Sequence, residues 1–518
     1  MSNGNIDPLF YLIKSLTKAE KRSFKIFASR NGNPDDLKFI KLFDLIDKHK
    51  EYDEEKILER EPLIKPVQLS NLKAHLYKQI LQSLRISNPE NSIYLTIREM
   101  VDYTQLLYNR CLYDQSLKML EKAKALAIKY DKNYLLFEIL DLEKKLVTRF
   151  LKTNIDERVT ALIGETETIK EKLSNITDFS NLTLKLYSFY IKIGFIRNQK
   201  EFEIANNFLY STLPVFKEEL LSFSEKMHLY NSFTGYFFFI QDFQRGYEYA
   251  QKLVNHFDIN SQYIVPKIEM YIRAINNLLM AQSKLSKYDE FLVTVDKFDT
   301  IEKLSDFIIT PNIELLLFKY RSTHKINRYF LLGELTEGSK TIPEIADNLK
   351  QFSDRLDKHY TLIFYYKFAC MYFGDEQYTK TKFWLNQIIN DKETDLRSDI
   401  HCFARILNLI SNYELNDLDL IDYHIRSTYR FLAKKDDLHL FQKIVLKFLK
   451  RLGKITQNQL TDALKDLLEQ LQPLEQTVYE KRAFMYFDIL SWLESKIQRR
   501  TLQEVIQEKT QKRIKHFY

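Results

Sequence analysis

The sequence predicts an all-α protein built as an array of antiparallel helical hairpins, and three observations support this fold class. The first is the scarcity of glycine and proline: the chain of 518 residues holds only 10 of each, about 2% against usual frequencies of about 7% and 5%. Tight β-hairpins and doubly wound sheets use glycine at their turns, so both become improbable. The second is helical apolar periodicity along the chain, and the third is a repeat of 40–45 residues.

Helix starts are marked by a recurring N-terminal signal. A Ser or Thr followed three residues later by Glu or Gln lets the two side chains satisfy free backbone N–H groups of the first turn. The signal occurs at Thr17–Glu20, Ser222–Glu225, Thr341–Glu344, Thr456–Gln459 and Thr477–Glu480. We expect a helix to begin at each of these positions.

Residues 1–90 are predicted to form a helical N-terminal cap. A polar loop, Asn31–Asp36, separates the first helices from one at Leu37–Lys50. The segment Glu61–Pro66 separates that helix from a strong one at Val67–Ser87, and Asn88-Pro89 ends the unit, because the residue before a proline is disfavoured in a helix.

From residue 91 onward one pattern recurs: a helix, a short break, an aromatic or apolar residue, and a small or apolar residue three places later. The residue after each break is Tyr113, Phe202, Phe243, Tyr288, Tyr378 or Leu418. If the two longest intervals count as two repeats each, the period is 40–45 residues, which is typical of helical-hairpin arrays. Stacked hairpins share a core and leave a long concave surface. We expect repeats over residues 91–455 and capping helices with a basic tail over 456–518.

This pattern resembles the tetratricopeptide repeat, in which an aromatic near the turn is accompanied by small residues in both helices. The matching sets are Tyr378 with Thr381 and Ala369, Tyr113 with Ser116 and Thr104, Phe243 with Gly246 and Thr234, and, in part, Phe202 with Ala205. The period exceeds the roughly 34 residues of that family, which longer helices would explain. The resemblance implies a right-handed superhelical solenoid whose concave face holds a peptide or another protein.

In the register of that family, groove-facing positions carry side chains that suit a peptide backbone and acidic groups. These candidate partner-binding residues are Arg98, Gln105, Asn109, Tyr190, Arg197, Asn198 and Asn231. We therefore expect a non-enzymatic scaffold or adaptor that binds protein or peptide and uses no cofactor.

Basic residues near the C-terminus indicate an alternative partner. A candidate basic docking strip consists of Arg426, Arg430, Lys443, Lys447, Lys450 and Lys454. It suits an acidic protein segment or phosphate, although the pattern favours a solvated helix face whose lysine stems lie along apolar surface. A single long helix predicted over Val478–His516 also ends in basic residues. The alternative function is a regulator that contacts RNA or DNA through these helices or the N-terminal cap, where polar residues open the helix Val67–Ser87.

No catalytic or metal site is predicted. The stretch Gly333–Thr341 approaches a phosphate-binding loop, but Ser339 stands where the motif requires Lys. We interpret it as a turn between two helices, with Gly333 ending the first and Thr341 capping the second. No two His have the spacing of a helical zinc motif, and no CxxC occurs.

The composition favours a cytoplasmic protein with no inserted membrane segment. The three cysteines, Cys111, Cys370 and Cys402, fit a reducing compartment. The first apolar run, Leu9–Ile13, is too short for a signal-peptide core, and no run approaches the roughly 18 residues that cross a bilayer.

Overall fold

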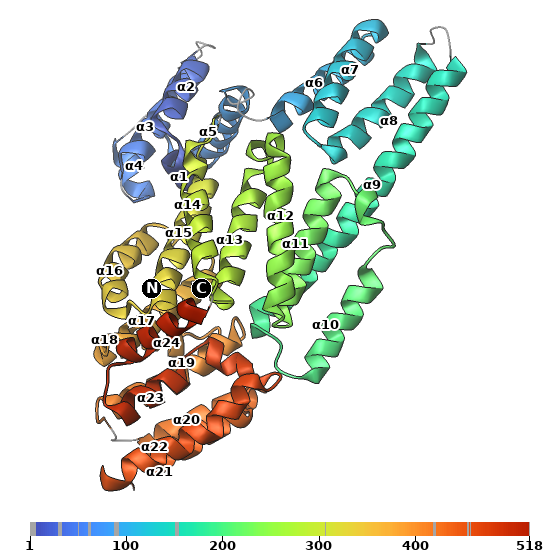
Figure 1. The fold of residues 1–518 in the computed structure, drawn as a ribbon. Coiled ribbons are helices and arrows are strands. Elements are labelled where there is room, and N and C mark those ends of the chain that lie inside the picture. The colour runs from blue at the N-terminus through green and yellow to red at the C-terminus, as the bar shows by residue number, and fades with distance from the viewer. Residues whose placement is uncertain are drawn as a thin grey trace. The chain divides into compact units, whose positions relative to one another are not determined.

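The computed structural model describes residues 7–29, 34–49, 51–60, 64–87, 93–150, 155–305, 307–417, 421–452, 455 and 457–516. Every regular element within these ranges is a helix, which confirms the all-α class (Figure 1). The chain folds into two compact units, Met1–Lys170 and Glu171–Tyr518. One long helix, α9 (Ile155–Ile193), begins in unit 1 and ends in unit 2.

Unit 1 contains two groups of helices, each with its own core. Its helices before α9 are α1 (Pro8–Ser15), α2 (Lys18–Ser29), α3 (Pro34–Lys48), α4 (Glu54–Arg60), α5 (Pro66–Ser87), α6 (Ile93–Tyr108), α7 (Tyr113–Lys129) and α8 (Asn133–Arg149). Helices α1–α5 bury Phe24 and Phe43 among others, and α6–α8 bury Leu120 and Ile139. The predicted capping box at the start of α2 is confirmed: Thr17 N donates to Glu20 (2.8 Å) and Glu20 N donates to Thr17 Oγ1 (3.2 Å).

Unit 2 is a longer succession of helices in which each packs against its neighbours in the chain. Its α-helices after α9 are α10 (Gln199–Thr212), α11 (Phe223–Phe239), α12 (Phe243–Ile259), α13 (Ile268–Lys284), α14 (Tyr288–Asp299), α15 (Pro311–Leu332), α16 (Leu335–Gln351), α17 (Lys358–Gly374), α18 (Tyr378–Ile389), α19 (Ser398–Glu414), α20 (Ile421–Lys434), α21 (Leu440–Leu452), α22 (Gln457–Leu471), α23 (Ile489–Gln498) and α24 (Leu502–His516). Short 3₁₀ helices are η1 (Glu218–Leu220), η2 (Ser261–Tyr263), η3 (Val265–Lys267), η4 (Ile301–Lys303), η5 (Gln472–Gln476) and η6 (Glu480–Met485).

The helix starts predicted from the repeat hold at four positions. Helices α7, α12, α14 and α18 begin at Tyr113, Phe243, Tyr288 and Tyr378. Phe202 lies inside α10, and Leu418 falls outside the described residues. The Ser222–Glu225 capping box at the start of α11 is also confirmed.

One turn geometry joins most hairpins. The residue two places before the next helix has a positive φ, as at Gln241 (64°) and Glu376 (57°). The following N–H donates to the carbonyl five residues back, for example from Asp242 to Phe237 (2.8 Å) and from Gln377 to Tyr372 (2.9 Å). These are Schellman turns, usually built on glycine. Here they are mostly made without it, which is consistent with the low glycine count.

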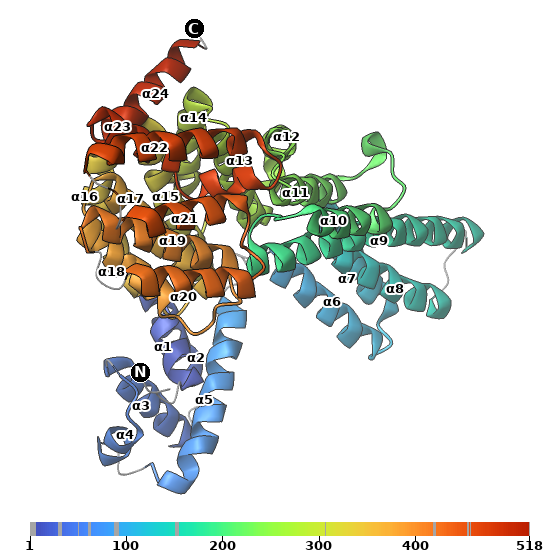
Figure 2. The ribbon, with the colours of Figure 1, turned by 90° about the horizontal axis from the view of Figure 1, so that it is seen from below.

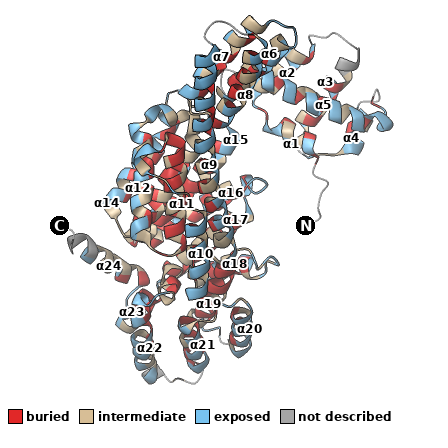
Figure 3. Cartoon of the chain, turned by 90° about the vertical axis from the view of Figure 1, so that its right-hand side faces the viewer, coloured by how far each residue is buried: buried red, intermediate tan, exposed pale blue. Residues whose placement is uncertain are grey.

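The small residues of the repeat lie where helices cross. Thr104, Ser116, Ala205, Thr234, Ala369 and Thr381 are at most 1% exposed. A Cβ on Gly246 would collide with the Phe238 ring, so this crossing requires glycine. Figure 3 shows buried residues concentrated on α11 and other inner helices of unit 2, with exposed residues along the outer helices such as α14.

The predicted turn over Gly333–Thr341 is wrong beyond its first residues. Gly333 does end α15 in the left-handed region (φ 69°), but α16 starts two residues later and runs through Pro343. Thr341 is therefore no N-cap, and its Oγ1 donates to Gly338 O inside the helix (2.8 Å).

Contacts from distant segments explain this early helix start. Gln503 Oε1 accepts from Thr336 N (2.8 Å), while Asp375 accepts from Thr336 Oγ1 (2.7 Å) and Ser339 Oγ (2.5 Å). These bonds and the burial of Leu335 and Ile342 outweigh the backbone hydrogen bond that Pro343 cannot make. A phosphate loop also needs a preceding strand, and residues 311–332 form α15 instead.

The single long helix predicted over Val478–His516 is also wrong. The segment forms η6, α23 and α24 instead. Arg499 ends α23 with a left-handed φ of 54°, and a capping box between Thr501 and Glu504 starts α24. Glu480, expected to complete a capping box with Thr477, accepts from the N–H groups of Leu440 (2.9 Å) and Phe441 (3.0 Å) and so caps α21. The remaining predicted cap, Thr456, lies outside the described residues.

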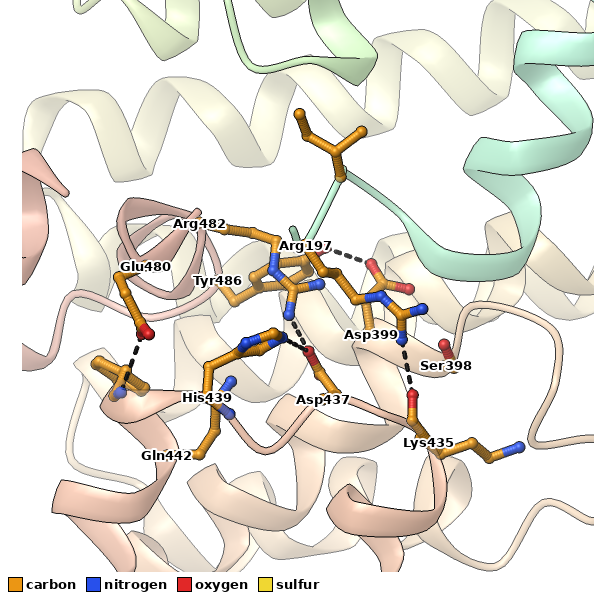
Figure 4. A network of polar contacts seen from close by, with 12 residues as sticks. Arg197, Ser398, Asp399, Lys435, Asp437, His439, Gln442, Glu480, Arg482 and Tyr486 are labelled. Atoms are coloured by element: carbon orange, nitrogen blue, oxygen red, sulfur yellow. Dashed lines mark hydrogen bonds and ion pairs between the residues drawn. The ribbon is translucent and has the colours of Figure 1, made fainter. Parts of the chain in front are cut away.

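Helices far apart in the sequence meet within unit 2. The N–H of Arg397, just before α19, donates to Ile191 O in α9 (2.8 Å), and Ser398 Oγ donates to Lys192 O (3.1 Å). Arg197 Nη1 donates to Lys435 O (2.7 Å), at the turn after α20 (Figure 4). We call these the closure contacts, because they tie the beginning of the succession to its later helices.

The C-terminal helices return to the middle of unit 2. Helix α24 packs on α15, and Thr510 Oγ1 donates to Leu331 O (3.4 Å). In the view from below (Figure 2), α22 and α23 lie in front of α13 and α15, and α24 follows α23 toward the C-terminus.

Candidate ligand-binding site

Unit 2 contains a cavity of about 1540 Å³. On α13 the lining residues are Arg273, Asn276, Asn277, Met280, Ser283 and Lys284, at spacings that share one helix face. Helices α11, α15 and α17 contribute lining residues at similar spacings. The volume exceeds the roughly 300–1,000 Å³ of ordinary small-molecule pockets and suits a longer ligand.

The C-terminal segment supplies one wall of this cavity. Lining residues include Lys481 and Tyr486 around η6, Leu490 on α23, and Ile506 and Lys509 on α24. The fold-back of α23 and α24 therefore shapes the cavity. Solvent reaches it, because the lining residues Arg273 and Asp289 are exposed.

Tyrosines and asparagines make up much of the uncharged polar lining. The tyrosines include Tyr187, Tyr190, Tyr320 and Tyr360, and the asparagines are Asn231, Asn276, Asn277 and Asn327. An asparagine amide offers both a donor and an acceptor, as a peptide bond does. Tyrosine rings give contact area with few rotatable bonds to immobilise. The lining is therefore chemically suited to an extended peptide.

A chain of hydrogen bonds links three of the lining helices. Lys367 Nζ on α17 donates to Asn327 Oδ1 on α15 (2.5 Å). His324 lies between Asn327 (Nδ2 to Nδ1, 3.4 Å) and Asn276 on α13 (Nε2 to Oδ1, 3.0 Å). Asn276 in turn donates to Asn277 Oδ1 (3.2 Å).

The protonation of His324 fixes the direction of this chain. Burial, reinforced by the positive charge of Lys367, lowers the pKa of His324 to about 3, so the ring is neutral near pH 7. Its single N–H then donates to Asn276 while Nδ1 accepts from Asn327. The chain holds Asn276 and Asn277 in place and leaves the side-chain nitrogen of Asn277 with no acceptor among the described residues.

Two lysines face the cavity without a carboxylate partner. Lys284 makes no side-chain hydrogen bond or ion pair with any described residue, and Lys367 has only the neutral amide of Asn327. Burial and the nearby Arg397 charge lower the pKa of Lys284 to about 8. Burial and the charge of Lys284 likewise lower the pKa of Lys367 to about 8. At neutral pH both are mostly protonated, so this part of the cavity is cationic.

Several carboxylates of the lining are already engaged. Glu290 pairs with Lys287 (2.8 Å), Glu494 pairs with Lys509 (2.9 Å), and Asp488 caps α23 by accepting from Ser491 N (3.0 Å). The exposed Arg273 also makes no ion pair with a described residue. The positive charge around Lys284 and Lys367 is therefore not balanced by these acids.

Arg397, which also lines the cavity, differs from the two lysines because its charge is paired. Its Nη2 lies 2.6 Å from Asp399 Oδ2, and its guanidinium lies over the Tyr190 ring, 4.9 Å from the centroid. Tyr486 OH donates to the same carboxylate. Burial alone would raise the pKa of Asp399, but Arg397 outweighs it and holds that pKa below its usual range.

Two of the sequence-predicted groove residues in unit 2 line the cavity, namely Tyr190 and Asn231. The other two have local roles. Asn198 caps α10 by accepting from Glu201 N (2.9 Å). Arg197 pairs with Glu201 (2.5 Å) and makes a closure contact, and its side chain is 10% exposed.

The remaining predicted groove residues belong to unit 1. Arg98 pairs with Glu138 (2.6 Å) and contacts Tyr94. Gln105 Nε2 donates to Asn109 Oδ1 (3.0 Å), and Gln105 also lines a small cavity of about 160 Å³. Within unit 1 these three residues thus form two separate local groups.

The described members of the basic docking strip lie on the surface. Arg426 and Arg430 on α20 and Lys443, Lys447 and Lys450 on α21 are all exposed, and none forms an ion pair with a described residue. Lys454 lies outside the described residues. By contrast, basic residues near the C-terminus are partly neutralised, since Lys509 pairs with Glu494 and Arg500 pairs with Glu508 (2.5 Å).

Sequence reasoning missed the cavity lysines and the buried hydrogen-bond chain. One signal was present: Lys367 is the only charged residue in the apolar run Leu362–Met371. Burying a lone lysine in such a run costs free energy, and this cost could have identified Lys367 as a candidate functional residue. Lys284, at the end of α13, carries no comparable signal.

Among the described residues, no helix combines the length and apolar character needed to cross a membrane. They also contain no group of three or more His, Cys, Asp or Glu side chains placed to hold a metal ion. Comparison with known proteins gives no match to this chain among protein-family models, curated proteins or solved structures.

Proposed function

We propose that unit 2 is a peptide-binding module and that the protein is a non-enzymatic scaffold or adaptor. In this proposal its helical hairpins form a right-handed solenoid of tetratricopeptide type, and the ligand lies along the inner helices. The single observation that carries the proposal is the cavity of about 1540 Å³ with four lining asparagines on three helices, α11, α13 and α15.

The asparagine positions support an extended peptide over a compact ligand. Asn231, Asn277 and Asn327 come from α11, α13 and α15. Amides supplied by successive helices can meet successive peptide groups of one strand-like segment. The buried chain through His324 holds two of these amides in fixed orientations before any ligand arrives, which lowers the entropic cost of binding.

The test fills the cavity without disturbing its walls. Gly235 on α11 lines the cavity, and a Cβ built there meets no heavy atom within 4 Å. The full-length protein is screened against an immobilised library of unstructured peptides, and hits are titrated by fluorescence anisotropy. We expect the Gly235→Trp variant to lose binding at least tenfold.

A matched control is available in unit 1. Gly164 on α9 is exposed, and a Cβ there also meets no neighbour within 4 Å. Gly164→Trp makes the same chemical change outside the cavity and should bind hits like wild type. Equal affinities of Gly235→Trp and Gly164→Trp for every hit would contradict the proposal.

A second candidate function rests on the basic docking strip. We propose that the unpaired cations of α20 and α21, together with the exposed Tyr423 and Tyr429, contact the phosphates and bases of a nucleic acid. Binding of this kind weakens steeply with salt, and stacking on tyrosine is tolerant of sequence.

Filter binding of single-stranded RNA and DNA across a salt series tests this second candidate. Lys443→Glu/Lys447→Glu should reduce the affinity at low salt and flatten the salt dependence. Lys340→Glu/Lys350→Glu is the control, since both lysines are exposed and pair with acids on their own helix (Glu337 and Asp347). The second candidate function is contradicted if the wild-type protein retains no RNA or DNA on the filter, or if both variants retain equal amounts.

A further inference from the structure

The positive charge of the cavity around Lys284 and Lys367 has no balancing carboxylate among the described residues, and this indicates which chemical group of a ligand would bind there. Lys284 and Lys367 repel each other, since the charge of Lys284 lowers the pKa of Lys367. No carboxylate of a described residue pairs with either one. Both side chains are half-buried, and two neighbouring ammonium groups that lose part of their hydration are unfavourable unless an anion joins them.

The buried cations elsewhere in unit 2 each have a partner that Lys284 lacks among the described residues. Arg397 has Asp399, and Arg482 has Asp437, with both partners of each pair almost fully buried. Lys319 lies over the Tyr360 ring, 3.8 Å from its centroid. Lys284 has neither a carboxylate nor a ring.

We infer that Lys284 and Lys367 form an anion subsite that binds one carboxylate group of the peptide. The inference rests on the proposed peptide-binding function and names the ligand group that the cavity selects. Lys367 Nζ is already oriented by Asn327, so it can donate a second hydrogen to a carboxylate oxygen. Lys284 Nζ keeps all three of its hydrogens for the ligand.

A carboxylate fits this subsite better than a phosphate group. The donors are two ammonium groups, one of which already donates to Asn327. Lys284 is the last residue of α13, and a helix C-terminus carries partial negative charge. That end stabilises the lysine but disfavours a doubly charged anion. The carboxylate comes either from the C-terminus of the peptide or from an Asp or Glu side chain.

Two kinds of peptide derivative distinguish these sources. A library hit is resynthesised with an amidated C-terminus, and separately with each Asp changed to Asn and each Glu to Gln. Removal of the correct carboxylate also removes its charge-assisted hydrogen bonds, so it should weaken wild-type binding about 10- to 100-fold. The derivative that produces this loss identifies the source.

Protein variants then locate the effect. Lys284→Met should abolish the preference for the carboxylate while keeping most of the affinity for the neutral derivative. Lys287→Met is the matched control, because Lys287 also lines the cavity but is paired with Glu290. It should keep the full preference. A preference that survives in Lys284→Met, or is absent from wild type, overturns the inference even if peptides bind.

A second measurement does not depend on any peptide. Acetate, which carries a single carboxylate, is added to wild type and to the two variants, and the melting temperature is recorded at pH 7. Ligand binding to the folded state raises it, so we expect a rise for wild type and Lys287→Met and a smaller rise for Lys284→Met. Equal rises in all three proteins contradict the subsite. Failure of the peptide-binding proposal gives a different result: acetate raises the melting temperatures as expected, but Gly235→Trp weakens the binding of no peptide.

Discussion

Two of the places where unit 2 holds positive charge away from solvent are built differently. Near the closure contacts, each arginine has its own carboxylate: Arg397 with Asp399 and Arg482 with Asp437. In the cavity, Lys284 and Lys367 have none among the described residues. A buried charge without a partner lowers stability, so the paired site has a structural role, whereas the unpaired site is the one at which we propose that a ligand binds.

The largest effect is expected from breaking a paired site. Asp437→Asn removes the carboxylate that accepts from Arg482, and both side chains are at most 2% exposed. It should lower the free energy of unfolding by about 3–5 kcal/mol, as removal of one partner of a buried ion pair generally does. Urea denaturation measures this. The control Asp347→Asn breaks an exposed pair with Lys350 and should cost less than about 1 kcal/mol.

Acid should act on the same paired site. The charge of Arg482 outweighs burial and holds the pKa of Asp437 below its usual range. Its stabilising contribution is therefore complete above the unfolded-state pKa of about 4 and is lost as the pH falls through the folded-state value. Denaturation at pH 3–6 should show wild-type stability falling toward that of Asp437→Asn. A constant difference between the two proteins down to pH 3 would be inconsistent with the paired description.

A smaller loss of stability is expected at Gly194, where the backbone conformation near the closure contacts requires glycine. Gly194 has a φ of 76°, and a Cβ there would press against Asp399 and Tyr486. Gly194→Ala should cost about 2 kcal/mol or more, since the left-handed region alone costs other residues about 1–2 kcal/mol. Gly164→Ala, in an open helical position, should instead stabilise by up to about 1 kcal/mol. The two variants, measured by urea denaturation, should thus change stability in opposite directions.

The unpaired site should respond in the opposite sense to Asp437→Asn. Lys284→Met removes a charge that burial disfavours, so at pH 7 it should raise the free energy of unfolding by about 1–2 kcal/mol. Lys287→Met, which loses its pair with Glu290, should change stability by less than about 1 kcal/mol. A loss of stability in Lys284→Met would mean that Lys284 has a structural role after all.

The smallest effect is the pH dependence of that gain. The pKa of Lys284 is about 8 in the folded protein, against about 10.5 when unfolded. Between these values the unfolded chain binds more protons, so wild-type stability rises with pH there. The advantage of Lys284→Met should be full below pH 8 and shrink toward pH 10.5. Lys284→Met should also raise the pKa of Lys367, now about 8, because the charge of Lys284 helps to lower it. The difference between the two proteins therefore reports both lysines, whereas Cys370, whose pKa burial raises to about 12, is present in both.

The parts of the fold that depend on neighbours in sequence were predictable. Local turn chemistry marks the helix starts at Tyr113, Phe243, Tyr288 and Tyr378, because each follows a break in the apolar pattern. The errors come from distant contacts. Gln503 and Asp375 extend α16 past the expected cap at Thr341, and Glu480 caps α21 instead of its own segment.

The candidate site was predictable only in part, for a related reason. Tyr190 and Asn231 follow from the helical register, whereas Arg197 and Asn198 satisfy local partners that the register ignores. Lys284 becomes notable only when α13, α17 and the C-terminal segment surround one space. Which lysine lacks a carboxylate is a property of that three-dimensional arrangement.

The bond between the Arg397 N–H and Ile191 O also bears on how unit 2 unfolds. An open row of repeats loses its end units one by one, since each contacts only its neighbours. Here residues about two hundred positions apart hold each other, so fraying from α9 also loosens α19. Progressive truncation should therefore not yield a ladder of shorter, stable fragments, and unit 2 should melt in a single transition.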